Sequence, residues 1–368
     1  MRKIGLVITA ALAALSFPLP ARRAGATPST IVEQRVTFQV LNSNSSDVPC
    51  QSDGQAYEIH GLLTGPRAAL AAPNASISLY LHGFSFGGKY LFTFKTGEHY
   101  DWDAELAGMG HISLAIDRLG YDESGHPNGA DTCFGSAADQ THQIIQSLRH
   151  GTYTVDSGGR PVSFQRVVLV GHDTGGGAAE IEAYSKAFRD PVTGASDIDA
   201  LVVWGWADSD YSTWVYQRLP DRTAFCLQGG EAAENDQPDG PRGYFSWPVS
   251  DEEVRAGVGM HMDPTVLDAA LRLRNRNPCG DLYSAATTSL YNAASGSLGE
   301  IHVPVLLIYE DEDIIYNDSA GPNQKARFTG SDDVTLVMLE GPGHFPMLEL
   351  RRQEYQQLVG TWLAAHGS

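Results

Sequence analysis

Apolar and polar positions follow two different patterns along this 368-residue chain. Residues 35–41 and 57–63 alternate with a period of two, which predicts an antiparallel hairpin at the edge of a sheet. Later runs are almost wholly apolar, as expected of parallel strands that are buried on both faces. These runs cover residues 77–81, 111–116, 167–170, 200–204, 303–309 and 334–339.

Helical periodicity appears between several of these runs, at residues 137–148, 178–188 and 354–365. Strands that alternate with helices predict one α/β domain with a mostly parallel central sheet. One long interruption, residues 205–297, is irregular and rich in Trp, Tyr, Gly and Pro, with a clear helix pattern only at 264–275. Long structureless loops are uncommon in compact domains, so we expect a lid there, between core segments 27–204 and 298–368.

The first 26 residues have the order of a secretory signal peptide. Met1-Arg2-Lys3 precedes an apolar run at 4–15, and small residues follow at 24–26. The run is shorter than the ~20 residues that span a membrane, so we expect a secreted, extracellular protein without membrane association. Loss of residues 1–26 removes four basic and no acidic residues, which changes the formal net charge from −19 to −23. Such an acidic surface repels nucleic acid.

Four cysteines, an even number without C-x-x-C spacing, predict two disulfides in an exported chain. Three pairings are possible. We prefer Cys50 with Cys133 and Cys226 with Cys279, because each pair then joins segments on the same side of the strand at 167–170.

That strand continues into Gly171-His-Asp-Thr-Gly-Gly-Gly177 and then into a helix-forming stretch, which is the pattern of a nucleophile elbow, G-x-Nuc-x-G, with Asp173 as the nucleophile. A carboxylate suits displacement at saturated carbon, because the ester it forms can then be cleaved by water. The alternative is that Asp173 only caps the following helix.

Other strand ends supply the remaining parts of a catalytic site. His82-Gly83 follows the run at 77–81, so the backbone N–H of Phe84 and that of Thr174 can form an oxyanion hole. His344 lies in a Gly-Pro-Gly turn after the last strand, the position of a general base. Asp313 follows the strand at 303–309 and is the preferred acid to orient this histidine. Asp208, after the strand at 200–204, is the alternative acid.

The order of nucleophile, acid and histidine resembles that of the α/β-hydrolase superfamily, from about residue 57 to the C-terminus. The segment 117–125 is similar to one that this family often carries after its fourth strand. The elbow resembles the Asp-nucleophile branch of epoxide hydrolases and dehalogenases, although Ser85 replaces the proline of the H-G-x-P loop and Thr174 replaces the usual tryptophan. The rest of the chain is similar to secreted actinobacterial esterase-like hydrolases, whose elbow usually reads Gly-His-Ser.

The resemblance implies an epoxide-hydrolase-like attack on a small apolar or amphipathic molecule through an alkyl-enzyme ester. It also implies lid tyrosines as proton donors, for which Tyr211 and Tyr216 are available. Halide release would use indole donors, and Thr174 removes the usual one, so dehalogenation ranks below epoxide opening.

Two other functions remain open from the sequence. One is an esterase-related lyase or cyclase with Asp173 as base or electrostatic group, and the other is a non-catalytic ligand-binding pseudohydrolase. We expect no cofactor and no metal, since His261 and Asp263 lack a third ligand. The oligomeric state is left open.

Overall fold

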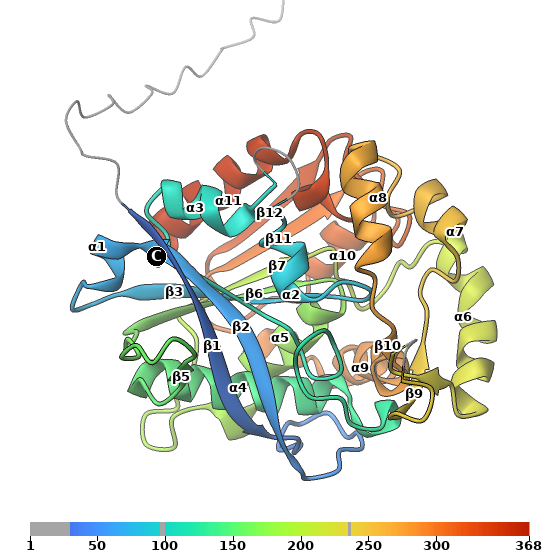
Figure 1. Cartoon of the computed structure of the whole chain (residues 1–368), viewed down its shortest axis with the longest axis horizontal. Coiled ribbons are helices and arrows are strands. Elements are labelled where there is room, and N and C mark those ends of the chain that lie inside the picture. The colour runs from blue at the N-terminus through green and yellow to red at the C-terminus, as the bar shows by residue number, and fades with distance from the viewer. Residues whose placement is uncertain (1–29, 96–99, 235–236, 368) are drawn as a thin grey trace, which may run out of the picture.

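The computed structural model describes residues 30–95, 100–234 and 237–367. The expected signal peptide, residues 1–26, lies outside these residues. The fold is built around a nine-stranded sheet with the strand order β12-β11-β7-β6-β3-β4-β2-β1-β5 (Figure 1).

Six strands form the parallel part of the sheet, as the apolar runs predict. They are β3 (Ser76–Leu81), β4 (Ser113–Ile116), β6 (Arg166–His172), β7 (Ala200–Trp204), β11 (Val305–Glu310) and β12 (Val334–Leu339). The expected hairpin is present as β1 (Ile31–Leu41) and β2 (Ala56–Pro66), and β2 joins the sheet antiparallel to β4. The hairpin was expected at the edge of the sheet, but the two-residue strand β5 (Thr154–Val155) pairs with β1 and forms that edge.

Helices cover both faces of the parallel strands, which explains why these strands are apolar throughout. Figure 1 shows α3 (Trp102–Gly108) and α11 (Arg352–His366) on one side, and α4 (Phe134–His150) and α5 (Thr174–Tyr184) on the other. The shorter elements are α1 (Arg67–Leu70), α2 (Gly88–Leu91), α10 (Ala320–Lys325) and the 3-10 turns Gly129–Asp131, Lys186–Phe188, Ser297–Glu300 and Pro346–Leu348.

Residues 205–297, which we call the inserted segment, leave the sheet after β7 and return before β11. They form α6 (Thr213–Leu227), α7 (Asp251–Ala256), α8 (Pro264–Arg272) and α9 (Cys279–Ser295), with a small sheet of β8 (Glu231–Ala232), β9 (Arg242–Phe245) and β10 (Asn277–Pro278). The expectation of one clear helix was therefore wrong. Pro220 interrupts the helical signal of α6, and α9 consists mostly of small and polar residues without a continuous apolar stripe.

Two disulfides join Cys50 to Cys133 and Cys226 to Cys279, in the pairing that we preferred from the sequence. The first attaches the segment after β1 to the start of α4, and the second joins α6 to α9. Among the described helices, none combines the length and the apolar character needed to cross a bilayer.

Candidate active site

Asp173 occupies a sharp turn between β6 and α5. Its backbone has φ 50° and ψ −128°, a conformation that costs energy for any residue except glycine. Gly175 allows this turn, because a Cβ there would lie 2.4 Å from the carbonyl oxygen of Leu81. Gly83 leaves room for the nucleophile candidate itself, since its Cβ would lie 2.4 Å from Oδ2 of Asp173. The glycines therefore allow the elbow to bring its side chain close to the loop after β3.

The two carboxylate oxygens of Asp173 have different surroundings. The N–H of Phe84 donates to Oδ2 at 2.8 Å, whereas Oδ1 lies 3.7 Å from Nε2 of His344. The carboxylate accepts no hydrogen bond from the first turn of α5, so its geometry is not that of a helix cap. Burial alone would raise the pKa of Asp173, but the adjacent His344 and the Phe84 N–H lower it below the ordinary value, which favours the anion.

His344 lies between two carboxylates. Its Nδ1 is 3.0 Å from Oδ2 of Asp313, whose Oδ1 accepts the backbone N–H of Ile315 at 2.7 Å. Burial lowers the pKa of His344, but the charges of Asp313 and Asp173 outweigh it and raise this pKa well above its ordinary value. The two carboxylates therefore favour the imidazolium form of His344.

Asp208, the alternative acid, lies elsewhere. Its carboxylate accepts hydrogen bonds from the amides of Asn292 at 3.0 Å and Gln324 at 3.2 Å. Burial raises the pKa of Asp208 to about 6. The structure thus brings Asp313, and not Asp208, to His344.

Two residues that sequence reasoning did not single out hold the His344 loop. Burial lowers the pKa of His172 to about 3, so its neutral ring donates from Nε2 to the His344 carbonyl at 2.8 Å. Both carboxylate oxygens of Glu349 accept the N–H of Gly343 at 3.0 Å. The place of His172 inside the elbow motif was a usable signal, whereas nothing in the sequence pattern marked Glu349.

The loop after β3 is held by hydrogen bonds that involve His82 and Ser85. Nε2 of His82 accepts the backbone N–H of Arg118 at 2.9 Å, so Nδ1 carries the proton and donates to the Gly83 carbonyl at 2.8 Å. Ser85 has φ 74° and donates its N–H to Oδ1 of Asn277 at 2.6 Å. A proline at this position could provide neither feature, which accounts for the departure from the H-G-x-P pattern.

Thr174 is the first residue of α5, where a backbone N–H has no partner within the helix. It is the second expected oxyanion donor. Its side chain Oγ1 accepts a hydrogen bond from Nη2 of Arg118 at 3.2 Å. Arg118 in turn forms a buried ion pair with Asp281 of α9 at 3.0 Å, so the start of α5 is linked to the inserted segment.

Asp173 and His344 line a cavity of about 440 Å³. Most of its remaining wall comes from apolar residues of the inserted segment, including Val215, Leu219, Val254 and Leu282. A mainly apolar cavity with few polar groups is typical of a site for a small organic ligand.

Three tyrosines line the same cavity. Tyr211 is largely shielded from solvent and its ring stacks on that of Tyr316, with centroids 5.0 Å apart, whereas Tyr216 is 58% exposed. Burial, with the charge of Asp173 as a further cause, raises the pKa of both Tyr211 and Tyr316. The structure therefore places Tyr316 beside Tyr211. Sequence reasoning missed it because it follows β11 and is not in the inserted segment.

Indole donors are poorly placed for halide binding. Trp206 lines the cavity, but its N–H donates to Oε2 of Glu180 at 3.2 Å. Trp214 and Trp247 pack edge to face with centroids 5.2 Å apart. These contacts favour a role for Trp206 and Trp247 in the cavity wall.

Comparison with known proteins gives one family and several similar structures. A model of the alpha/beta hydrolase family matches residues 79–357. An esterase from Thermogutta terrifontis is 16% identical, with a TM-score of 0.58 over 90% of this chain and 100% of the esterase. No curated protein matched the chain.

Two lipases have a similar fold. A monoacylglycerol lipase from Paleococcus ferrophilus is 17% identical, with a TM-score of 0.56 over 84% of this chain and 99% of the lipase. The monoglyceride lipase of Saccharomyces cerevisiae is 14% identical, with a TM-score of 0.56 over 89% of this chain and 97% of the lipase. At these identities the likeness concerns the fold, while the family match covers most of the chain, so this protein belongs to the alpha/beta hydrolase family and is a hydrolase.

Proposed function

We propose that this hydrolase uses Asp173 as a covalent nucleophile and opens epoxides of small apolar or amphipathic molecules through an alkyl-enzyme ester. The observation that carries the proposal is that the two carboxylate oxygens of Asp173 have different surroundings. Oδ2 is held by the Phe84 N–H, and Oδ1 faces His344 beside an apolar cavity. A carboxylate arranged in this way has one oxygen for attack and one for the later oxyanion.

In the first step, Oδ1 of Asp173 attacks a ring carbon of the epoxide. A carbon–oxygen bond forms, the ring carbon–oxygen bond breaks, and the departing oxygen takes a proton from a tyrosine. Tyr211 and Tyr316 are the donors that we favour, because the hydroxyl of Tyr211 and the whole side chain of Tyr316 are buried. Both groups keep their protons, since burial and the charge of Asp173 raise their pKa. Tyr216, the other expected donor, is mostly exposed and is a weaker candidate.

In the second step, a water molecule gives a proton to Nε2 of His344 and attacks Cγ of Asp173. The oxyanion forms on Oδ2, where the N–H of Phe84 and the first N–H of α5 stabilise it. Collapse of this intermediate breaks the bond between Cγ and Oδ1, and the diol leaves with Oδ1 and the proton from His344. Asp173 regains its carboxylate with one oxygen from water, and the second proton of that water passes to His344, which becomes an imidazolium again.

Formation of the alkyl ester changes the protonation state of His344 before this step. The free site holds two carboxylates against the imidazolium, and the ester removes the charge of Asp173. Loss of that charge lowers the pKa of His344, so the ring releases its proton and becomes a base. The released proton restores the tyrosine that protonated the departing oxygen. Asp313 keeps the ring oriented throughout.

We further propose that the protein is exported and that its inserted segment acts as a lid. The two disulfides favour an oxidising compartment, and the order of charge and apolar residues at the N-terminus favours cleavage after residue 26. N-terminal sequencing of the protein recovered from the culture medium would test this proposal, and a protein retained inside the cells with residue 1 intact would contradict it.

The covalent role of Asp173 can be tested by single turnover in ¹⁸O-water with panels of epoxides, haloalkanes and esters, followed by mass measurement of the Asp173 peptide. We expect epoxides to react and one ¹⁸O to enter Asp173. In His344→Gln the alkyl ester should form and accumulate.

Turnover without label in Asp173 would contradict the covalent cycle and favour Asp173 as a base, as in a lyase or cyclase. Binding without turnover or adduct would favour a ligand-binding pseudohydrolase. Asp173→Asn is the matched variant, since it keeps the shape of the side chain but removes the nucleophile.

A further inference from the structure

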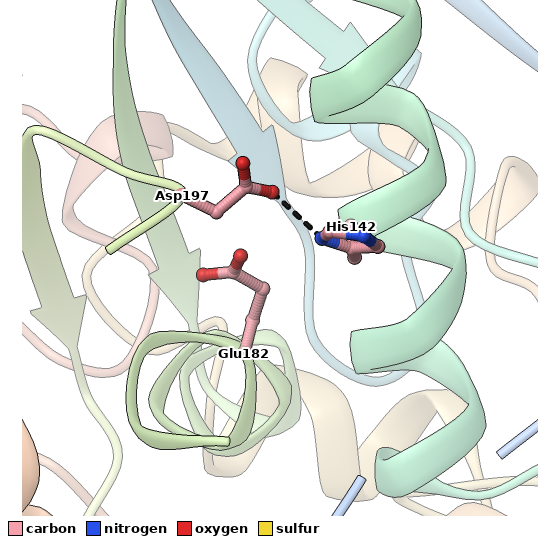
Figure 2. A group of neighbouring side chains, drawn as sticks. All are labelled: His142, Glu182 and Asp197. Atoms are coloured by element: carbon pink, nitrogen blue, oxygen red, sulfur yellow. Dashed lines mark hydrogen bonds and ion pairs between the residues drawn. The ribbon is translucent and has the colours of Figure 1, made fainter. Parts of the chain in front are cut away.

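A second group of ionisable side chains lies apart from the active site, where α4, α5 and the segment before β7 meet (Figure 2). His142 comes from α4, Glu182 from α5 and Asp197 from the segment before β7. Figure 2 shows their polar ends directed toward one another. One ligand atom from each lies within 4.8 Å of the others, close enough to share one ion.

The contacts among the described residues do not explain why the carboxylate of Glu182 is buried. Its side chain is almost fully buried, and neither carboxylate oxygen has a hydrogen-bond partner among the described residues. A buried carboxylate without partners is costly, and native proteins normally provide a partner or an ion. Burial and the charge of Asp197 raise the pKa of Glu182 well above its ordinary value.

The other two groups are already held in place. Nδ1 of His142 lies 2.8 Å from Oδ2 of Asp197, and Gln146 donates to Oδ1 of Asp197 at 2.6 Å. The His142 ring stacks on Phe188 with centroids 4.9 Å apart. Its side chain is 25% exposed, so an ion can reach the group from solvent. A site with ligands fixed by packing and outer hydrogen bonds is preorganised for binding.

We propose that His142, Glu182 and Asp197 bind one divalent transition-metal ion of the zinc type. One imidazole and two carboxylates form a mixed nitrogen and oxygen set that suits Zn²⁺, with water as the fourth ligand. Mg²⁺ and Ca²⁺ prefer oxygen ligands alone.

Such an ion would link α4 to α5, the helix that begins at the nucleophile elbow. It would also link both helices to the segment before β7. The expectation of no metal missed the group, because its members come from three separate elements and form no short motif.

The test uses the full, untagged chain after treatment with a chelator, since a histidine tag would itself bind zinc. Titration calorimetry with Zn²⁺ should give one ion per chain, and Mg²⁺ and Ca²⁺ should bind far more weakly. At about 100 times its dissociation constant, zinc should raise the melting temperature by about 5 °C. Co²⁺ should give the visible absorption bands of a protein-bound ion.

Glu182→Gln keeps the size of the side chain but removes the charge. It should weaken zinc binding by more than the ~10–100-fold that loss of an outer-shell partner costs. The matched control is His366→Gln, because His366 forms a surface pair with Asp333 at 3.1 Å and should not affect the site. If Glu182→Gln does not fold, the more exposed His142→Gln replaces it.

The proposal is overturned if the wild-type chain binds no stoichiometric zinc. It is also overturned if the ligand variant binds zinc as tightly as His366→Gln, or if Ca²⁺ binds in preference to Zn²⁺. In the first two cases Glu182 is a buried acid that binds no zinc, and in the third the group selects Ca²⁺. Because the active site is separate, none of these outcomes bears on the proposed reaction.

Discussion

The imidazole of His344 must be charged in one half of the proposed cycle and neutral in the other. In the free enzyme, Asp313 and Asp173 raise the pKa of His344, so the ring is an imidazolium that favours the attacking anion. In the ester only Asp313 remains charged, and the pKa of His344 falls. The two half-reactions therefore depend on different protonation states.

This difference predicts that the alkyl ester accumulates as pH falls. Its hydrolysis needs neutral His344 and should slow by about tenfold per pH unit below the pKa of His344 in the ester. Ester formation needs ionised Asp173, whose pKa is lowered, and should persist at least down to its ordinary value of 3.8. Rapid-quench mass measurement at several pH values gives both rates. Formation and hydrolysis that decline together over the same pH range would contradict the assignment of the two groups.

The tyrosines give a second prediction for single residues. Tyr211→Phe or Tyr316→Phe should slow ester formation from an epoxide by about 10²-fold or more, because each removes a proton that the departing oxygen needs. Hydrolysis of the ester, once formed, should change little. Single-turnover quench experiments separate the two steps. Tyr216→Phe is the matched control and should behave as wild type, since its side chain is mostly exposed. A strong effect of Tyr216→Phe alone would reverse this choice of donor.

Among whole elements, the link between α9 and the start of α5 passes through Arg118. Its guanidinium pairs with Asp281 at 3.0 Å, and both side chains are almost fully buried. Arg118→Met should destabilise the protein by about 3–5 kcal/mol, because Asp281 is left buried without its cation. Urea unfolding with an unchanged slope would measure this loss.

The double variant Arg118→Met/Asp281→Leu is the control for that prediction. It removes both charges, so most of the lost stability should return. Catalysis should be impaired in both variants, because Thr174 loses the hydrogen bond from Arg118 in each. A double variant as unstable as the single one would show that packing around Arg118, and not the ion pair, provides the stability.

The sequence predicted elements well where burial imposes a pattern. The run at 200–204 coincides with β7, because a strand buried on both faces must be apolar along its whole length. The run at 334–339 coincides with β12, although this edge strand is only half-buried along most of its length. By contrast, α9 remained unrecognised, since a helix of small residues shows little periodicity. Prediction therefore failed mainly in the inserted segment, where the helices lack a clear apolar stripe.

The residues of the candidate site also differ in how well the sequence predicted them. Asp173, Asp313 and His344 each follow a recognisable strand, and parallel strands deliver their carboxyl ends to one edge of the sheet. Tyr316 and His172 contact residues that are distant in the sequence, and Glu349 contacts Gly343 within one loop. The spacing of the sequence motifs encodes none of these contacts. The choice of Asp313 over Asp208 likewise required coordinates, because both follow strands of the same sheet.

For the molecule as a whole, the sheet and the inserted segment contribute different parts of the candidate site. The sheet supplies the proposed reacting groups Asp173 and His344, whereas the inserted segment supplies most of the apolar cavity wall. The acidic net charge of −19 does not by itself select a substrate, because the cavity is lined mainly by uncharged side chains. Substrate choice should therefore depend on how firmly the helices of the inserted segment are held over the sheet.

The disulfide Cys226–Cys279 provides the sharpest test of this dependence, because it joins α6 and α9, which both line the cavity. Its cysteines are 53 residues apart, so Cys226→Ser/Cys279→Ser should cost about 4 kcal/mol of stability in the chain-entropy model. Ester formation should fall by about tenfold or more, since a looser wall positions the substrate poorly. Ester hydrolysis should change less, because Asp173, His344 and Phe84 all belong to the sheet and its loops.

The control for this test is Cys50→Ser/Cys133→Ser, which opens a separation of 83 residues and should cost a similar ~4.5 kcal/mol. Neither α4 nor the segment between β1 and β2 that contains Cys50 lines the cavity, so ester formation per folded molecule should stay close to wild type. Thermal unfolding and single-turnover rates measured on both double variants separate general stability from cavity shape. Equal losses of ester formation in the two variants would mean that the inserted segment does not position the substrate.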